Sequence, residues 1–291
     1  MFSQLLVNAL IASSIYALVG VGFSLIYQVQ RFFHFTHGLA YALGAYATFA
    51  FIKLGLPMFA AATLGICASG IFGILLDVCM IAPVRKHNGS ALVLLLASIG
   101  AYIVGQNLIS IFLGDDLKTL GSGNVSAGFQ IFNARITSDQ IVIIAGSAVA
   151  IAAVALWLYV SHFGKQIRTI ACDEQLAVIL GMPVGRIRLV VMAVGSGLAG
   201  LAGIFSGINQ AIVPTMGMSA LLAGVVAMIV GGRTSMLGAA AGGLIIGIAE
   251  NMCAIWLPLA WQDAVVFVIL ILFLLLRPQG LFGQPLRQAT I

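Results

Sequence analysis

Long apolar runs separated by short polar segments dominate the chain. A helix that crosses the hydrocarbon core of a bilayer needs about 20 apolar residues. Nine stretches approach or reach that length: 4–28, 37–53, 57–82, 91–113, 140–160, 188–212, 217–232, 236–256 and 261–276. The pattern predicts an all-α polytopic membrane protein with eight or nine transmembrane helices.

Two of these stretches, 37–53 and 217–232, are short for a crossing. At 1.5 Å per residue each reaches only about 25 Å, slightly less than the core of a typical bilayer. Both follow a long apolar stretch, and both contain or adjoin glycines. Short, glycine-interrupted segments in corresponding positions of two halves indicate a transport pathway built from an internal repeat. Two ordinary short helices would explain the pattern equally well.

The basic residues predict the orientation of the helices, because cytoplasmic loops of membrane proteins carry an excess of Lys and Arg. If all nine stretches cross and the N-terminus is outside, the inner segments hold ten basic residues and the outer segments three. If 217–232 is re-entrant, the split falls to seven against six. The charges therefore favour an odd number of crossings, with the N-terminus outside and the C-terminus inside.

The composition excludes most classes of soluble protein. Of the 291 residues, 62% are apolar and only 7% are charged, and the mean hydropathy is +1.15. A soluble chain of this length could not bury so much apolar surface, which rules out a water-soluble enzyme, a nucleic-acid-binding protein and a disordered chain. The net charge of +5 is then better explained by membrane topology than by binding of nucleic acid.

Small residues recur on helix faces in the C-terminal half. They are spaced every four residues in two of the stretches, at Gly195, Ala199, Gly203 and Gly207, and at Gly238 and Gly242. Such faces let helix backbones approach closely and gain dispersion contacts that lipid would not supply. We expect them to be packing surfaces inside the helix bundle.

Few polar side chains lie within the predicted crossings, and each could line a solute path or join two helices. Two interpretations stay open for Glu250: a contact to the ammonium group of a passing amino acid, or a hydrogen bond between helices, which is the commoner role. Asp77 is expected to pair with Arg85 or Lys86. The candidate residues of a substrate path are His37, Asn107, Asn209, Glu250 and Asn251.

The sequence indicates neither a metal site nor a catalytic centre. The four cysteines are far apart, and His34 and His37 have no third ligand in view, so we expect no metal and no cofactor. The Gly164-Lys165 pair is followed by Gln166 and does not fit an ATP-binding P-loop. The chain is therefore not expected to be an enzyme, and any ATP hydrolysis must take place in a separate protein.

Two connections are long. Segment 114–139 is polar and expected outside, and its loose alternation near 129–136 is compatible with a short hairpin. Segment 161–187 is expected inside, with a short helix near 173–180 that Asp173 would cap and Gly181 would end. So short a helix is unstable alone, and a docking helix and an amphipathic helix on the lipid headgroups fit equally well.

This inner segment carries a resemblance to a known family. An Ala-x-Asp-x-x-x-Ala-x-x-x-Gly run, similar to the cytoplasmic coupling loop of permeases in ATP-binding-cassette importers, is formed by Ala171, Asp173, Ala177 and Gly181. Together with Phe35-Thr-His-Gly38, Gly44-Ala-Tyr46 and Arg277-Pro-Gln-Gly-Leu-Phe-Gly283, it resembles the branched-chain amino acid permease family over nearly the whole chain. The family usually has Asn where His34 stands.

The resemblance implies that residues 1–291 form a single permease domain in the bacterial cytoplasmic (inner) membrane, importing branched-chain or related amino acids. It implies two cytosolic ATPase subunits, a second identical or homologous permease and an external solute-binding protein as partners, and no nucleic acid. The residues then expected to couple to the ATPase are Ala171, Asp173, Glu174, Ala177 and Gly181. A self-sufficient secondary carrier or channel, or a structural membrane protein, are the alternatives.

Overall fold

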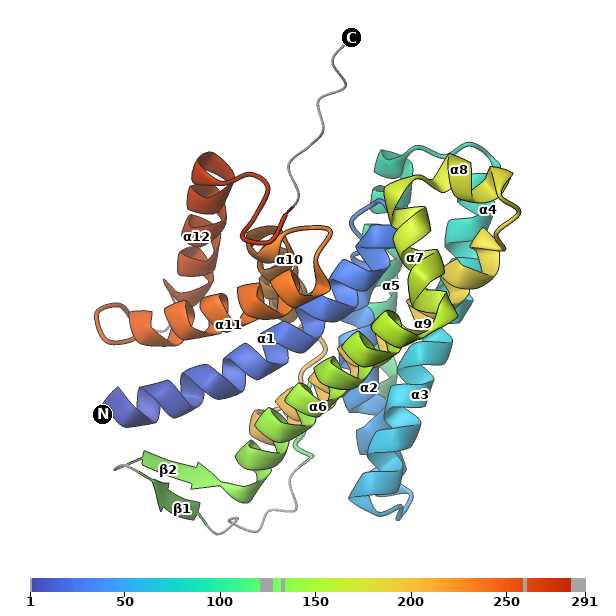
Figure 1. Ribbon diagram of the computed structural model, residues 1–291. Coiled ribbons are helices and arrows are strands. Elements are labelled where there is room, and N and C mark those ends of the chain that lie inside the picture. The colour runs from blue at the N-terminus through green and yellow to red at the C-terminus, as the bar shows by residue number, and fades with distance from the viewer. Residues whose placement is uncertain (1, 121–127, 132–133, 259–260, 284–291) are drawn as a thin grey trace.

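The computed structural model describes residues 2–120, 128–131, 134–258 and 261–283, and these are mostly helical (Figure 1). The longest helices are α1 (Phe2–Gln30), α3 (Met58–Leu76), α5 (Ala91–Leu113), α6 (Ser138–Val160) and α9 (Val184–Asn209). The intermediate ones are α2 (Thr36–Lys53), α10 (Met216–Gly231), α11 (Met236–Cys253) and α12 (Gln262–Leu276). The short ones are α4 (Ala82–Lys86), α7 (His162–Cys172) and α8 (Glu174–Ile179).

The lengths of the helices confirm an all-α polytopic fold. Within the described part of the chain, six helical segments are long and apolar enough to cross a membrane: Phe2–Gln30, Met58–Lys86, Ala91–Leu113, Ser138–Val160, Val184–Asn209 and Met236–Cys253. Helices α10 and α12 are apolar but have only 16 and 15 residues. The short segments thus include 261–276, which the sequence analysis did not single out.

The third crossing is longer than the apolar run that predicted it. After α3 the helix continues through a π-helical turn, η1 (Asp77–Ile81), and then through α4 to Lys86. Pro83 would normally break a helix, because it lacks an N–H group and its ring crowds the preceding turn. A π-helical turn widens the backbone locally and is a common way to accommodate such a disruption.

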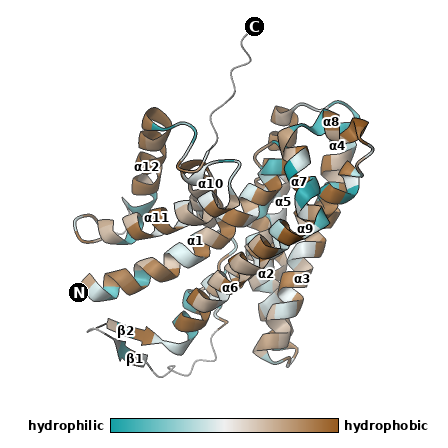
Figure 2. Cartoon of the chain, in the orientation of Figure 1, coloured by the Kyte–Doolittle hydropathy of each residue, from teal (hydrophilic) through white to brown (hydrophobic). Residues whose placement is uncertain are grey.

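Helices α1 and α9 form the centre of the bundle. The most apolar window is 78% buried in α1 and 67% buried in α9, against 22% in α5 and 11% in α6. The peripheral helices therefore present apolar side chains to lipid. Figure 2 shows hydrophilic positions gathered around α4, α7 and α8, at one end of the molecule.

The packing follows the arrangement expected of an internal repeat. Helix α1 packs on α9, α10 and α11, and α9 packs on α1, α2 and α3; α2 packs on α3 as α10 packs on α11. Gly22 of α1 meets Gly195 of α9, and Gly38 of α2 meets Gly217 of α10. In both pairs a Cβ atom added to either glycine would lie within 3.0 Å of the other's carbonyl oxygen. Segments α1–α3 and α9–α11 thus occupy corresponding places.

The small residues singled out in the sequence lie at helix contacts. Gly203 faces the Tyr41 carbonyl of α2, and Ala199 is fully buried. Gly207 faces Ile212 and Leu120. Gly238 and Gly242 lie where α11 contacts α10. A Cβ atom added to Gly238 would strike the Gly231 carbonyl oxygen, and one added to Gly242 would strike the Ala227 carbonyl oxygen.

The predicted hairpin is present beside the N-terminal end of α1. Strands β1 (Gly128–Ile131) and β2 (Ala134–Thr137) pair antiparallel. The Gln4 side chain of α1 donates to the Arg135 carbonyl (3.1 Å) and accepts from the Arg135 N–H (2.8 Å), completing a strand-like pair of bonds. The hairpin is thereby fixed to the first helix.

Candidate functional site: a polar pocket and a docking helix

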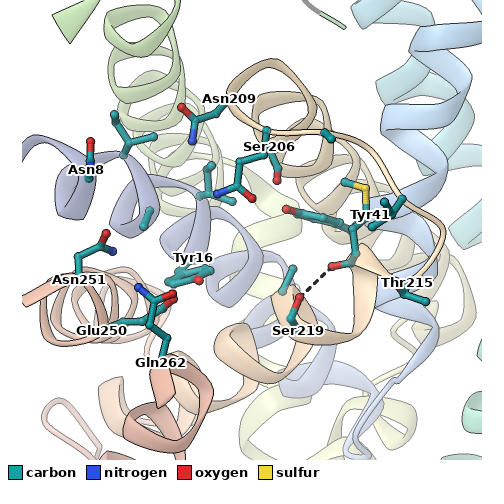
Figure 3. A pocket seen from close by; sticks show the side chains of 18 residues that line it. Asn8, Tyr16, Tyr41, Ser206, Asn209, Thr215, Ser219, Glu250, Asn251 and Gln262 are labelled. Carbon is teal, nitrogen blue, oxygen red and sulfur yellow. Dashed lines mark hydrogen bonds between the residues drawn. The ribbon is translucent and has the colours of Figure 1, made fainter. Parts of the chain in front are cut away.

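A polar cavity of about 680 Å³ lies among α1, α9, α10 and α11. Its walls come from the N-terminal half of α1, Tyr41 of α2, the C-terminal end of α9, the connection to α10 with its first residues, the end of α11 and the start of α12. The polar side chains that line it are Asn8, Tyr16, Tyr41, Ser206, Asn209, Gln210, Thr215, Ser219, Glu250, Asn251 and Gln262 (Figure 3). The remaining lining is apolar.

The pocket forms where two helices end and a third begins. Helix α9 ends at Asn209, since Gln210 is extended (φ −136°, ψ 176°) and leaves the helical path. The following segment is held to the 114–139 connection by paired backbone bonds between Ile212 and Lys118 (2.6 and 3.2 Å). The chain then turns into α10 at Thr215. This break places the polar residues of the α9–α10 connection beside α1 and α11.

Glu250 is the most unusual group in the pocket wall. Its side chain belongs to α11 and is only 8% exposed, and its Oε2 atom has no hydrogen-bond partner among the described residues. The Tyr16 hydroxyl of α1 lies beside it and donates a hydrogen bond to the Glu250 carboxyl group, which joins α1 to α11 (Figure 3). The negative field of Asp263, in the first turn of α12, also reaches it. An unsatisfied buried carboxylate oxygen costs free energy, which makes it a candidate for binding a donor from outside the chain.

The structure brings together three of the five candidate path residues. Asn209, Glu250 and Asn251 line the pocket. His37 does not: it is buried between α1 and α2, where its ring contacts the Val19 carbonyl (3.3 Å) and packs edge-on against Phe23. Asn107 is exposed on α5 and donates to the Ile103 carbonyl of its own helix (2.7 Å).

Sequence reasoning did not identify several pocket residues. Tyr16, Tyr41 and Gln262 line the cavity, and none was singled out. Tyrosine is common in apolar helices, so only the three-dimensional contact with Glu250 distinguishes Tyr16. The sequence offers only a weaker signal for the pocket. Polar residues recur near the ends of several apolar stretches, and the charge count predicts that these ends lie on the same side of the membrane.

The short helix expected in segment 161–187 is α8, with Asp173 and Gly181 at its ends. The Asp173 side chain accepts from the Leu176 N–H (3.0 Å). Gly181, with φ +75°, ends the helix. Its N–H donates to the Val178 carbonyl, and the N–H of Met182 donates to the Ala177 carbonyl. The preceding helix, α7, was not predicted; its buried Ile167 and Ile170 have the spacing of one helix face, which a search for long apolar runs overlooks.

Helix α8 is fixed to the bundle on one side and exposed on the other. Glu174 pairs with Arg188 of α9. Arg31, which follows α1, donates to the Ala171 carbonyl of the preceding helix, α7. Ala177 is fully buried in an apolar cluster with residues of α1, η1 and α9. The outer side presents exposed apolar residues, Leu176, Val178, Ile179 and Leu180. An exposed apolar surface of this kind marks a contact with another protein or with the membrane surface.

The expected direct pairing of Asp77 with Arg85 or Lys86 is wrong. Asp77 accepts from Gln30 Nε2 (2.7 Å), and Arg85 donates to Gln30 Oε1 (2.6 Å) and to the Gln30 carbonyl (3.1 Å). The amide of Gln30 offers both a donor and an acceptor, so it bridges the two charges. Lys86 is exposed.

Metal ligands do not gather in the described residues, where no group of three or more His, Cys, Asp or Glu side chains could hold an ion.

The profile of the branched-chain amino acid transport system permease component matches residues 5–274. The chain belongs to this family. It is 31% identical to the high-affinity branched-chain amino acid transport system permease protein LivH of Escherichia coli K12, over 98% of this chain and 96% of that protein. It is equally similar to BraD of Pseudomonas aeruginosa, with the same coverage of both chains. A probable LivH of Methanocaldococcus jannaschii is 26% identical, over 96% of this chain and 92% of that one.

A solved structure shares the fold. PsaBC from Streptococcus pneumoniae in complex with Fab contains a chain that matches with a TM-score of 0.55 at 15% identity, covering 95% of this chain and 93% of that one. The family and the six apolar segments together make this chain a multi-pass membrane protein with a role in transport.

Proposed function

We propose that the chain is the permease subunit of an ATP-driven importer that moves branched-chain or related amino acids inward across the cytoplasmic membrane. The observation that carries this proposal is α8, which is capped at both ends, paired with α9 through Glu174 and Arg188, and apolar on its exposed side. The relatives named as high-affinity permease proteins support the amino acid class of substrate.

In this proposal two cytosolic ATPase subunits drive transport, one of them docking on α8. Asp173 and Gly181 define the ends of the docking helix, and Ala171, Glu174 and Ala177 connect it to the bundle. Because Arg188 belongs to α9, one of the two most buried helices, and pairs with Glu174 of α8, movement of α8 would act directly on the centre of the bundle. ATP hydrolysis then takes place in the partner and not in this chain.

The pocket is the proposed substrate path, with Asn209, Glu250 and Asn251 in its wall. The charge count puts the N-terminus and the pocket end of α9 outside and the C-terminus inside, so the pocket would receive substrate from an external solute-binding protein. A second permease, identical or homologous, would complete the transmembrane part of the complex.

The docking role is tested with Ile179→Asp, which places a charge on the exposed face of α8. We expect the ATPase subunits to be lost from the complex purified through this chain, and ATP-driven leucine uptake into proteoliposomes to fall at least about tenfold. Lys86→Asp, a charge change at the same end of the molecule but off α8, is the matched control. ATPase retention and normal uptake in Ile179→Asp would contradict the proposal.

A self-sufficient carrier is distinguished by one further measurement. Leucine uptake into vesicles that contain only this chain would favour the carrier, whereas uptake that requires the ATPase subunits and ATP supports the importer.

A further inference from the structure

The charges of the pocket are strongly one-sided. Among the described residues that line it, Glu250 alone carries a formal charge, and the remaining polar groups are neutral amides and hydroxyls. Asp263 adds a second negative charge in the neighbourhood of Glu250. A cavity with one sign of charge between low-dielectric walls concentrates ions of the opposite sign and repels those of the same sign.

The unpaired oxygen of Glu250 provides a specific binding point for a cationic group. Glu250 is more than nine-tenths buried and lines the cavity, yet its Oε2 atom has no hydrogen-bond partner in the described part of the chain. An ammonium group has three donors and would satisfy that oxygen. A carboxylate would meet only repulsion there.

The rest of the wall suits the remaining parts of an aliphatic amino acid. Ile11, Ile15 and Met216 provide an apolar surface for a branched side chain. Figure 3 shows Glu250 and Gln262 on one side of the pocket and Thr215 on another, at the first turn of α10. A helix N-terminus favours an anionic group without carrying a net charge, so it can hold a carboxylate that is already attached to an ammonium.

We propose that the pocket binds the zwitterion of an aliphatic amino acid in one orientation, with its ammonium group on Glu250 and its carboxylate toward the first turn of α10, and that it rejects solutes of net negative charge. This inference rests on the proposed path through the pocket. It adds that the permease itself, and not only an external binding protein, discriminates by charge.

The test uses a single reporter cysteine, Ser219→Cys, in the full-length chain with its four native cysteines replaced by serine and held in lipid nanodiscs. Ser219 is an exposed residue of the pocket wall. We expect a cationic methanethiosulfonate to modify this cysteine at least about tenfold faster than an anionic one of similar size. Glu250→Gln should bring the two rates within about twofold of each other.

Three small molecules then separate the two ends of the ligand. L-Leucine and 3-methylbutylamine, which keep the ammonium group, should protect the cysteine, whereas 4-methylpentanoate, which keeps only the carboxylate, should not. Protection by the amine should disappear in Glu250→Gln and persist in Glu250→Asp, which also covers the case in which the glutamine variant does not fold. Asp77→Asn, a buried carboxylate far from the pocket, is the matched control.

Equal rates for the two reagents in the parent protein, or protection by 4-methylpentanoate as strong as by the amine, would overturn the inference. The assay needs no ATPase, so its outcome is separate from that of the proposed function. Charge selectivity without ATPase docking would refute only the importer, and ATP-driven uptake without charge selectivity would refute only the zwitterion site.

Discussion

Asp77 and Glu250 are buried carboxylates in corresponding halves of the molecule, and their surroundings differ in one decisive respect. Asp77 follows α3 and is bridged through Gln30 to Arg85, so its charge is balanced within the protein. Glu250 lies on α11 and keeps an oxygen without a partner in the described residues. The N-terminal half therefore uses its carboxylate as a structural joint near α8, and the C-terminal half keeps one available in a cavity.

The largest expected effect breaks the contact between the halves. Gly203→Leu would force a side chain against the Tyr41 carbonyl, where even a Cβ atom has no room. We expect folded protein, measured by size-exclusion chromatography of membrane extracts, to fall at least about tenfold. Gly100→Leu is the matched control, because nothing lies within 4 Å of a Cβ atom there. Well-folded Gly203→Leu protein with altered selectivity would contradict the packing role.

Next in size is the loss of the structural joint. Gln30→Leu removes the bridge and leaves Asp77 and Arg85 without their common partner, which we expect to destabilise the fold by about 3 kcal/mol. A thermal unfolding measurement in detergent should show a clear decrease in the midpoint. Glu250→Gln should shift the midpoint far less, since glutamine keeps an oxygen that can accept from Tyr16 and the replaced Oε2 has no partner in the described residues. Equal losses of stability would remove the distinction between the two carboxylates.

The sequence predicts the helices well and the bridge from Asp77 through Gln30 to Arg85 poorly, for physical reasons. Apolar runs and loop charges identify helices because both reflect the bilayer directly. The caps of α8 were visible because Asp173 and Gly181 act on neighbouring residues. The Gln30 bridge, in contrast, joins Gln30 to Asp77 and Arg85, which lie 47 and 55 positions further along the chain. The π-helical turn that precedes Pro83 has no local pattern that announces it.

The approach of Tyr16 to Glu250 was equally hidden, because it depends on how α1 packs against α11. Sequence spacing describes one helix at a time. It could mark Asn209, Glu250 and Asn251 as unusual in an apolar stretch, but it could not separate them from His37 and Asn107, which face elsewhere.

A smaller effect concerns the connection of α8 to the bundle. Glu174→Ala and Arg188→Ala each remove an ion pair whose side chains are partly exposed (39% and 15%), so each should change stability by less than about 1 kcal/mol. We expect a larger effect on coupling: ATP hydrolysis should lose its dependence on leucine and binding protein. The double exchange Glu174→Arg with Arg188→Glu should restore part of it. Full coupling in both single variants would show that this pair transmits nothing.

The smallest effect concerns pH and the connection between α1 and α2. Burial, and to a lesser extent the charge of His37, lowers the pKa of His34 from 6.5 to about 3. The unfolded chain therefore binds a proton below pH 6.5 that the folded chain does not bind, so stability should decrease as pH falls from about 6.5 toward 3. His34→Asn should make the unfolding midpoint less dependent on pH over this range. An unchanged pH dependence would assign the effect to other groups.

The most direct test of the account is a cross-link from α8. The four native cysteines are first replaced by serine, and one new cysteine is introduced, either Ile179→Cys on α8 or Phe112→Cys in the last turn of α5. Each variant is then treated with a short thiol-to-amine cross-linker in the purified complex. We expect a covalent product between Ile179→Cys and an ATPase subunit, and none from Phe112→Cys. An ATPase that co-purifies but cross-links only to Phe112→Cys, or to neither position, would contradict it.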